Sequence, residues 1–273
     1  METTGQRQPR IAVFDSGVGG LTVVAAAHAA LPGLHVRFLG DTARLPYGSK
    51  SASTVERYAL QATAHLARGD IDALVVACNT ASACALPALR AMYPFPVLGV
   101  IDPGAQQAVL ASVSGHIGVI GTERTVASGA YAEAIAKLRP DAVVHAKATP
   151  LLVSLAEEGW FDHPATEAAL QTYLGPFLSD PDVSKIDTLV LGCTHYPVFK
   201  PLLSQVLRQA LGRDIALVDS AQAVTQQLID LFPQAQQGQG QIELYATDSL
   251  DRFARVGGLF FPVYRAQLGL VDL

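Results

Sequence analysis

The sequence predicts a layered α/β fold with mainly parallel sheets. Short β-branched runs alternate with helical patterns along the chain, an alternation that is typical of βαβ units. Half of the 273 residues are hydrophobic and 16% are charged, which is the composition of a globular chain with a sizeable core. Weak similarity between segments of the first and second halves is a third observation, and it indicates two related halves.

Eight strands and several helices follow from the local patterns. Two helices have recognisable ends: 53–67, where Ser53 and Glu56 fit a capping box, and 201–211, which stops at Gly212. The glutamine-rich segment 233–241 is predicted to be a surface loop. The expected strands are 11–14, 36–39, 74–77, 97–100, 117–120, 142–145, 189–191 and 217–218.

Composition also limits the kinds of partner. The net charge of −5, from 19 Lys and Arg against 24 Asp and Glu, does not favour binding to nucleic acid or to an anionic membrane. No apolar run approaches the roughly 18 residues of a membrane span. The first ten residues, METTGQRQPR, lack the apolar core of a secretory signal and are predicted to be a disordered lead-in. We therefore expect a soluble, cytoplasmic protein that acts on a small molecule.

Two pairs of segments carry the similarity between the halves. IAVFDS, which ends at Ser16, resembles IGVIGT, which ends at Thr122, and LVVACNT around Cys78 resembles LVLGCTH around Cys193. In each half a strand stops at small polar residues before a helix, which is where open α/β sheets place ligands. If the halves face one another, the cleft between them receives one cysteine from each side. Similarities this short also arise by chance, so a duplication remains one of two interpretations.

The three cysteines are too few and too odd in number for a disulfide framework, and we expect free thiols. Cys84 lies within the apolar helical pattern 81–89 and is assigned to packing. Cys78 and Cys193 each end an apolar strand and precede hydrogen-bonding residues. Helix N-termini and nearby imidazoles lower a thiol pKa from about 8.5 towards neutrality, so both are candidates for proton exchange. The alternative for either cysteine is a small buried hydrophobe.

A metal site is not expected. Cys78, Cys84, Cys193 and His195 are the conceivable ligands, but no C-x-x-C pair occurs, and structural zinc normally uses closely spaced ligand pairs. His195 alone fits a structural residue or a catalyst equally well.

The glycine-rich segment DSGVGGLT, from Asp15 to Thr22, joins a predicted strand to a helix. Its glycines do not fit the dinucleotide fingerprint G-x-G-x-x-G, and no phosphate-binding G-x-x-x-x-G-K-[ST] motif occurs in the chain. Backbone N–H groups at such a helix start can hold a small anion such as a carboxylate, with Ser16 adding a hydroxyl. A tight turn that merely needs glycine is the alternative.

Other polar residues have weaker individual signals. Asp15 and Asp41 fall at strand ends, Tyr47 lies in the loop GDTARLPYG, and Glu157 lies near a helix end. Each has an ordinary structural alternative as a cap, a turn residue or a solvated carboxylate.

Four motifs together resemble the glutamate racemases, within the broader aspartate/glutamate racemase superfamily. They are FDSGVGGLTV, GDTARLPYG, CNTASACAL and GCTHYP, in the order and spacing of that family. The sequence departs from the commoner family pattern in two places. Cys84 occupies a position that is usually aliphatic, and SLAEEGW at 154–160 occurs where a Pro-Leu-Val-Glu sequence is frequent.

The resemblance implies interconversion of L- and D-glutamate without pyridoxal phosphate, metal or other cofactor, supplying D-glutamate for peptidoglycan. It implies two similar α/β domains with the active site in the cleft between them. We place the first domain at 1–98 plus 212–273 and the second at 99–211. Glutamate is the implied partner, and the resemblance is compatible with a homodimer.

The resemblance also assigns residues by matching position. Cys78 and Cys193 become the two groups that exchange the substrate proton, with Cys78 serving the D form and Cys193 the L form. The remaining assignments are substrate contacts at Asp15, Ser16, Tyr47, Gly48, Asn79, Thr80, Thr194 and His195, supporting roles at Asp41 and Glu157, and further substrate contacts at Thr122 and Thr125.

Three alternatives remain open at this point. The substrate could be another acidic amino acid such as aspartate. The chain could be a non-catalytic two-lobed amino-acid-binding protein with incidental cysteines. A pyridoxal phosphate enzyme could use one of five lysines.

Overall fold

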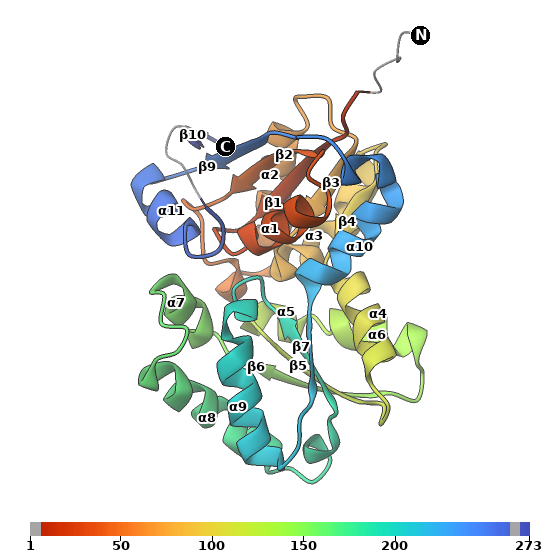
Figure 1. Ribbon diagram of the computed structural model, residues 1–273, viewed down its shortest axis with the longest axis vertical. Helices are drawn as coiled ribbons and strands as arrows, with labels where there is room; N and C mark the ends of the chain where they lie inside the picture. The colour runs from red at the N-terminus through yellow and green to blue at the C-terminus, as the bar shows by residue number, and fades with distance from the viewer. Residues whose placement is uncertain (1–6, 263–267) are drawn as a thin grey trace.

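The computed structural model describes residues 7–262 and 268–273. Over these residues the chain forms two parallel β-sheets, each packed against helices, and the two lobes lie one above the other in Figure 1. Most of the predicted N-terminal lead-in, residues 1–6, lies outside the described residues, and Arg10 already belongs to the first strand.

Each of the eight predicted strands overlaps a strand of the structure. The other two, β9 and β10, follow no clear pattern in the sequence: β9 comes after the glutamine-rich segment, and β10 is only three residues long. The strands are β1 (Arg10–Asp15), β2 (His35–Gly40), β3 (Ala73–Val76), β4 (Val97–Gly99), β5 (His116–Gly121), β6 (Val143–Ala148), β7 (Thr188–Gly192), β8 (Ala216–Asp219), β9 (Ile242–Ala246) and β10 (Leu268–Leu270).

Helices connect and cover these strands. The α-helices are α1 (Leu21–Ala30), α2 (Ala52–Leu66), α3 (Asn79–Met92), α4 (Ile101–Ala111), α5 (Glu123–Ala127), α6 (Ala130–Leu138), α7 (Leu151–Glu157), α8 (Pro164–Leu178), α9 (Lys200–Leu211), α10 (Ser220–Leu231) and α11 (Leu250–Gly257). Short 3-10 turns occur at η1 (Tyr47–Ser49), η2 (Val183–Lys185), η3 (Tyr196–Phe199) and η4 (Pro233–Gln236).

The two helix ends read from the sequence have different outcomes. The cap of α2 is Ser51, whose hydroxyl accepts the N–H of Thr54 at 3.3 Å, so the predicted cap at Ser53 is wrong by two residues. Ser53 lies inside the first turn. Helix α9 stops before Gly212 as predicted, because that glycine takes the left-handed conformation (φ 69°) that closes many helices.

The two sheets share a strand order. The first runs β10-β9-β2-β1-β3-β4 and the second β6-β5-β7-β8, with every pairing parallel. Read from one edge, β4-β3-β1-β2 therefore repeats as β8-β7-β5-β6. This repetition confirms the two similar halves expected from the sequence. It also places the carboxyl ends of β1 and β3 side by side at one sheet edge, and those of β5 and β7 side by side at another.

The predicted return to the first domain at residue 212 comes too early. Strand β8 pairs with β7 in the second sheet, since α9 is the crossover helix of a β7-α9-β8 unit. The chain returns to the first lobe after Asp219, where α10 packs against α1. Strands β9 and β10 then complete the first sheet.

Strand β1 is buried on both faces, which explains its continuous apolar sequence. Ile11 and Val13 pack with α1 on one side, and Ala12 and Phe14 pack with the α2 and α3 residues on the other. Such double burial fixes the central strands firmly, so the residues at their carboxyl ends have little freedom to move.

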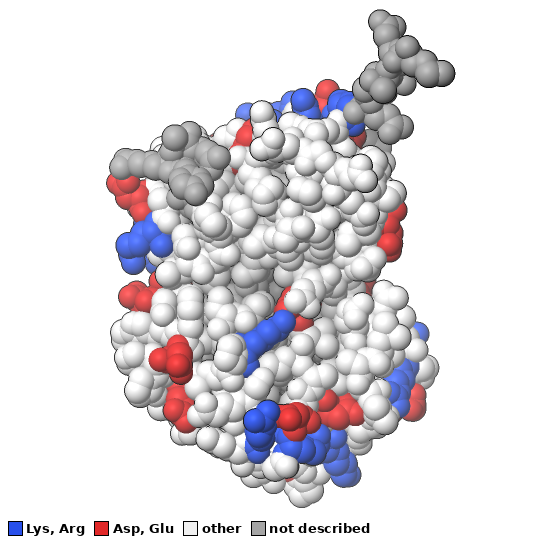
Figure 2. All heavy atoms as spheres, viewed as in Figure 1, with Lys and Arg blue, Asp and Glu red and all other residues white. Residues whose placement is uncertain are grey.

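Two surface properties bear on the partner classes. In the part of the chain that the structure covers, no helix combines the length and apolar character needed to cross a membrane. On the face shown in Figure 2, Lys and Arg lie beside Asp and Glu rather than in a basic patch.

We expect Cys84→Ala to lower the free energy of unfolding by about 1 kcal/mol and to leave the racemisation implied by the resemblance nearly unchanged. The reason is that Cys84 is only partly buried and packs against the apolar cluster under α2 and α3. Urea unfolding and an optical-rotation assay measure the two quantities. An activity loss as large as that of Cys78→Ala would contradict the assignment of Cys84 to packing.

Candidate active site

A cavity of about 390 Å³ lies between the two lobes and is lined by residues of both. Its lining includes all but three of the residues that the sequence assigned to catalysis, substrate contact or support. The three exceptions, Asp15, Asp41 and Thr125, are buried and lie outside the lining. Thr122 lines the cavity, and Thr125 is buried next to it. The facing sheet edges therefore bring the predicted residues together.

Cys78 caps the start of α3, directly after β3. Its sulfur accepts the N–H of Ala81 at 3.4 Å and lies 3.4 Å from the Ser16 hydroxyl. This is the strand-to-helix position that the sequence predicted. The prediction of a lowered thiol pKa is wrong here, because burial, reinforced by the charge of Asp15, raises the pKa of Cys78 to about 12. Ser16 and Ala81 oppose that rise without cancelling it.

Cys193 comes from the other lobe, directly after β7. Its side chain is buried, and its sulfur lies 3.8 Å from Nδ1 of His195. The two thiols thus face one cavity from different lobes, and each has its own polar partner: a helix N-terminus with Ser16 for Cys78, and an imidazole for Cys193.

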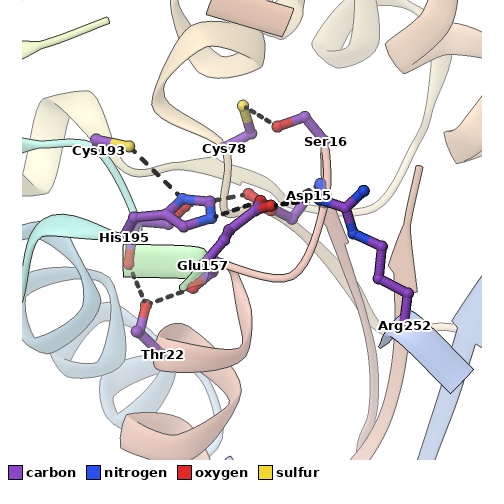
Figure 3. A network of polar contacts seen from close by, with 11 residues as sticks. Asp15, Ser16, Thr22, Cys78, Glu157, Cys193, His195 and Arg252 are labelled. Carbon is purple, nitrogen blue, oxygen red and sulfur yellow. Dashed lines mark hydrogen bonds and ion pairs between the residues drawn. The ribbon is translucent and has the colours of Figure 1, made fainter. Parts of the chain in front are cut away.

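His195 is buried between Cys193 and Glu157 (Figure 3). Its Nε2 lies 3.3 Å from Oε1 of Glu157. Burial alone would lower the pKa of His195, but its contacts with Cys193 and Glu157, with Asp15 acting at longer range, raise it to about 10. The imidazole is therefore protonated at neutral pH, and His195 acts as a buried cation beside a thiol.

Glu157 ends α7 and carries the charge that balances His195. Its second carboxylate oxygen accepts a hydrogen bond from Nη2 of Arg252 at 3.0 Å (Figure 3). Burial by itself would raise the pKa of Glu157, yet His195 and Arg252 outweigh it and lower the pKa below its ordinary value. Glu157 is thus a paired, nearly buried carboxylate and not a solvated one at a helix end.

Asp15 ends β1 and anchors the glycine-rich turn. Its carboxylate accepts the N–H of Gly17 at 3.0 Å, and burial raises its pKa despite the nearby charge of His195. Close approach explains the glycines, because a Cβ at Gly19 would lie 2.4 Å from Nδ1 of His195, and one at Gly20 would lie 2.5 Å from Cβ of Asp15. The turn packs directly on the acid and the imidazole.

Asp41 holds the loop that carries Tyr47 and Gly48. Its carboxylate accepts hydrogen bonds from the Tyr47 hydroxyl, from Nε of Arg44 at 2.6 Å and from the Thr247 hydroxyl at 2.9 Å. Asp41 thereby contacts the loop that forms part of the cavity wall and does not itself line the cavity.

Hydroxyl and amide groups complete the cavity wall. The Thr80 hydroxyl lies 2.9 Å from that of Thr122 and 3.1 Å from that of Thr125, and these contacts join the two lobes. Oδ1 of Asn79 accepts the Tyr131 hydroxyl at 2.7 Å, whereas its buried Nδ2 has no partner among the described residues. An unpaired buried donor at a cavity is available to an acceptor on a ligand.

Sequence reasoning missed Arg252, which lies in α11 and is the one Lys or Arg of the described cavity lining. No motif surrounds it, and the helix that presents it follows a strand that the sequence pattern did not reveal. The described lining therefore offers no lysine amine for a Schiff base. Among the residues in the structure, no group of three or more His, Cys, Asp and Glu side chains is arranged to hold a metal ion.

Comparison with known proteins places this geometry in a family. A glutamate racemase from Geobacter metallireducens is 45% identical over 268 residues, covering 94% of this chain and 96% of its own. The solved glutamate racemase isoform from Bacillus anthracis shares 33% identity at a TM-score of 0.88, covering 98% of this chain and 99% of its own. A Francisella tularensis glutamate racemase, solved with D-glutamate, shares 32% identity at a TM-score of 0.87, covering 97% and 98% of the two chains.

The family model for Asp/Glu/hydantoin racemases matches residues 21–228, which span both sheets. With the relatives above, this match shows that the chain belongs to the Asp/Glu/hydantoin racemase family and is an isomerase.

Proposed function

We propose that this protein interconverts L- and D-glutamate by a two-base reaction that needs no cofactor. The observation that carries the proposal is the pair of buried thiols, Cys78 and Cys193, which enter one cavity from different lobes. Racemisation removes a weakly acidic Cα proton and returns a proton to the opposite face, so two groups on opposite sides suit it.

The surroundings of the two thiols differ. Nδ1 of His195 lies 3.8 Å from the sulfur of Cys193, and a positive imidazole there can offset negative charge that develops on the sulfur during proton transfer. The raised pKa of Cys78 keeps that group a thiol at neutral pH. In the proposed reaction Cys193 acts as a thiolate and takes the Cα proton of one enantiomer, while Cys78 donates its own proton to the other face. The products are the opposite enantiomer, a Cys78 thiolate and a Cys193 thiol, and exchange with solvent restores the starting state.

Hydrogen-bond donors in the cavity support the charged intermediate. As the Cα proton leaves, negative charge spreads onto the α-carboxylate of the substrate. The unpaired Nδ2 of Asn79 and the hydroxyls of Thr80 and Thr122 are donors that can stabilise such charge.

The choice of glutamate rests on the relatives. Those cited above are named glutamate racemases, and the Francisella tularensis structure holds D-glutamate. In a cytoplasmic protein the consequence would be a supply of D-glutamate for peptidoglycan.

We expect D-glutamate to be turned over with a kcat/KM at least about tenfold higher than D-aspartate, since one methylene in a fitted pocket commonly discriminates to that degree. Optical rotation of purified protein with either amino acid, and no added cofactor, measures this. Equal or reversed preference would contradict the assignment of glutamate as the substrate, but it would not contradict the two-thiol mechanism.

Replacing one thiol at a time should separate the two half-reactions. We expect Cys78→Ser and Cys193→Ser each to lower racemisation at least about a hundredfold, because one acid/base group is lost. Each variant should still exchange the Cα proton of one enantiomer in heavy water, with opposite handedness in the two. By family resemblance, Cys78→Ser should exchange L-glutamate. NMR of the Cα signal follows the exchange.

The same two variants distinguish the competing interpretations. A binding protein with incidental cysteines would show no Cα exchange in the wild type or in either variant. Exchange of both enantiomers by a single variant would contradict separate roles for the thiols.

The pH dependence of Cys78 should respond to Asp15. Because the charge of Asp15 raises the pKa of Cys78, Asp15→Asn should lower the pH at which Cys78 ionises by about one unit. Below the thiol pKa the labelling rate follows the thiolate fraction, so iodoacetamide should label Cys78 about tenfold faster in Asp15→Asn than in the wild type at one fixed pH near 8, as measured by mass spectrometry. Asp214→Asn, at an exposed site, is the control. An unchanged or slower labelling rate in Asp15→Asn would show that Asp15 does not raise the pKa of the thiol.

A further inference from the structure

Arg252 belongs to the first lobe, whereas its ion-pair partner Glu157 belongs to the second. It lies in α11, which follows a strand of the first sheet, whereas Glu157 ends α7 and His195 follows β7, both in the second lobe (Figure 1). The contacts run in series: Nη2 of Arg252 to Glu157 at 3.0 Å, Glu157 to Nε2 of His195 at 3.3 Å, and Nδ1 of His195 to Cys193 at 3.8 Å. One cation of the first lobe thus ends a chain of contacts that leads to a thiol of the second.

The first lobe fixes the helix that presents Arg252. The next residue, Phe253, is 1% exposed and packs against Phe38 with ring centroids 6.1 Å apart, and Val256 on the same face is also buried. The guanidinium therefore projects from an anchored helix. It also helps to line a second, smaller cavity of about 60 Å³, so Arg252 and Glu157 stand between that cavity and the active site.

A purely structural role explains this arrangement poorly. The Arg252 side chain is 57% exposed, and an ion pair with so exposed a partner contributes little to the free energy of unfolding. Glu157, by contrast, is only 14% exposed. Without Arg252 its second oxygen would lose its hydrogen bond, and the carboxylate could rotate away from His195.

We propose that Arg252 is a positioning residue that holds Glu157, from across the cleft, in the orientation that serves the Cys193 half of the reaction. The inference rests on the proposed two-thiol racemisation. Among the described residues, the sulfur of Cys78 contacts Ser16 and the N-terminus of α3 and is not joined to Arg252 by such a series of contacts. The effect of Arg252 should therefore be confined to one face of the substrate.

Steady-state rates of Arg252→Gln in a protein that keeps both thiols cannot reveal such one-sidedness. Enantiomers have equal free energies, so kcat/KM must change equally in both directions. The half-reactions can be separated by adding Arg252→Gln to Cys78→Ser, which keeps Cys193, and to Cys193→Ser, which keeps Cys78. Cα exchange in heavy water at saturating glutamate is then measured for the enantiomer that each parent variant exchanges.

We expect Arg252→Gln to slow exchange by the Cys193 thiol roughly tenfold, within the range that misplacing a catalytic group costs, and to change exchange by the Cys78 thiol less than about twofold. Arg252→Lys should restore part of the loss, because an ammonium can still pair with Glu157. Arg255→Gln, an exposed arginine on the same helix outside the cavity lining, is the matched control and should change neither rate. Thermal unfolding should be nearly the same for all these variants.

Three results would overturn the proposal. Equal slowing of both exchanges, or a rise in KM for both enantiomers, would show that Arg252 binds substrate or closes the cleft. No slowing of either exchange would show a surface ion pair only. If the parent variants show no handed exchange at all, the two-thiol reaction itself fails, and this inference fails with it.

Discussion

Two parallel sheets with the same central strand order present their carboxyl edges to a common cleft, and every functional contact described above depends on this. Asp15 and Cys78 follow neighbouring strands of one sheet, and Thr122 and Cys193 follow the equivalent strands of the other. Because β1, β3, β5 and β7 are almost wholly buried, these positions are held by the core itself. Strand order thus places both thiols at the cavity, and the loop that carries Tyr47 and Gly48 completes its wall.

The repeat does not make the two sides of the cavity alike. Cys78 has a helix N-terminus, a serine and a buried acid around it, and burial keeps the pKa of its thiol high. Cys193 has a protonated imidazole that Glu157 in turn supports. A reaction that takes a proton from one face and gives one to the other needs a base and an acid at the same time. In the proposed reaction, different surroundings for two identical side chains would provide that difference.

Much of the site could be predicted because its residues follow strands. The motifs around Cys78 and Cys193 lie where an apolar run meets polar residues, and such positions converge at a sheet edge in any parallel α/β fold. The helix stop at Gly212 was equally local and equally readable. The capping box at Ser53 is the exception among these local predictions, because Ser51, two residues earlier, caps α2.

The other errors arise where distant parts of the chain meet. The thiol pKa of Cys78 depends on how much protein covers the sulfur, and the sequence cannot give that coverage. Strand β8 belongs to the second sheet because of its pairing with β7, which a helix end at residue 212 does not indicate. Arg252 reaches Glu157 over 95 residues of sequence, from a helix with no motif.

The claim that two thiols act on opposite faces is tested most directly by running the wild-type reaction in heavy water and following the Cα label early. If separate thiols act, product formed from either enantiomer carries solvent deuterium, because the donating thiol took its deuteron from the solvent. Unreacted substrate stays largely protiated. Substantial protium in the early product, in both directions, would mean that a single base returns the original proton, and it would contradict separate roles for Cys78 and Cys193.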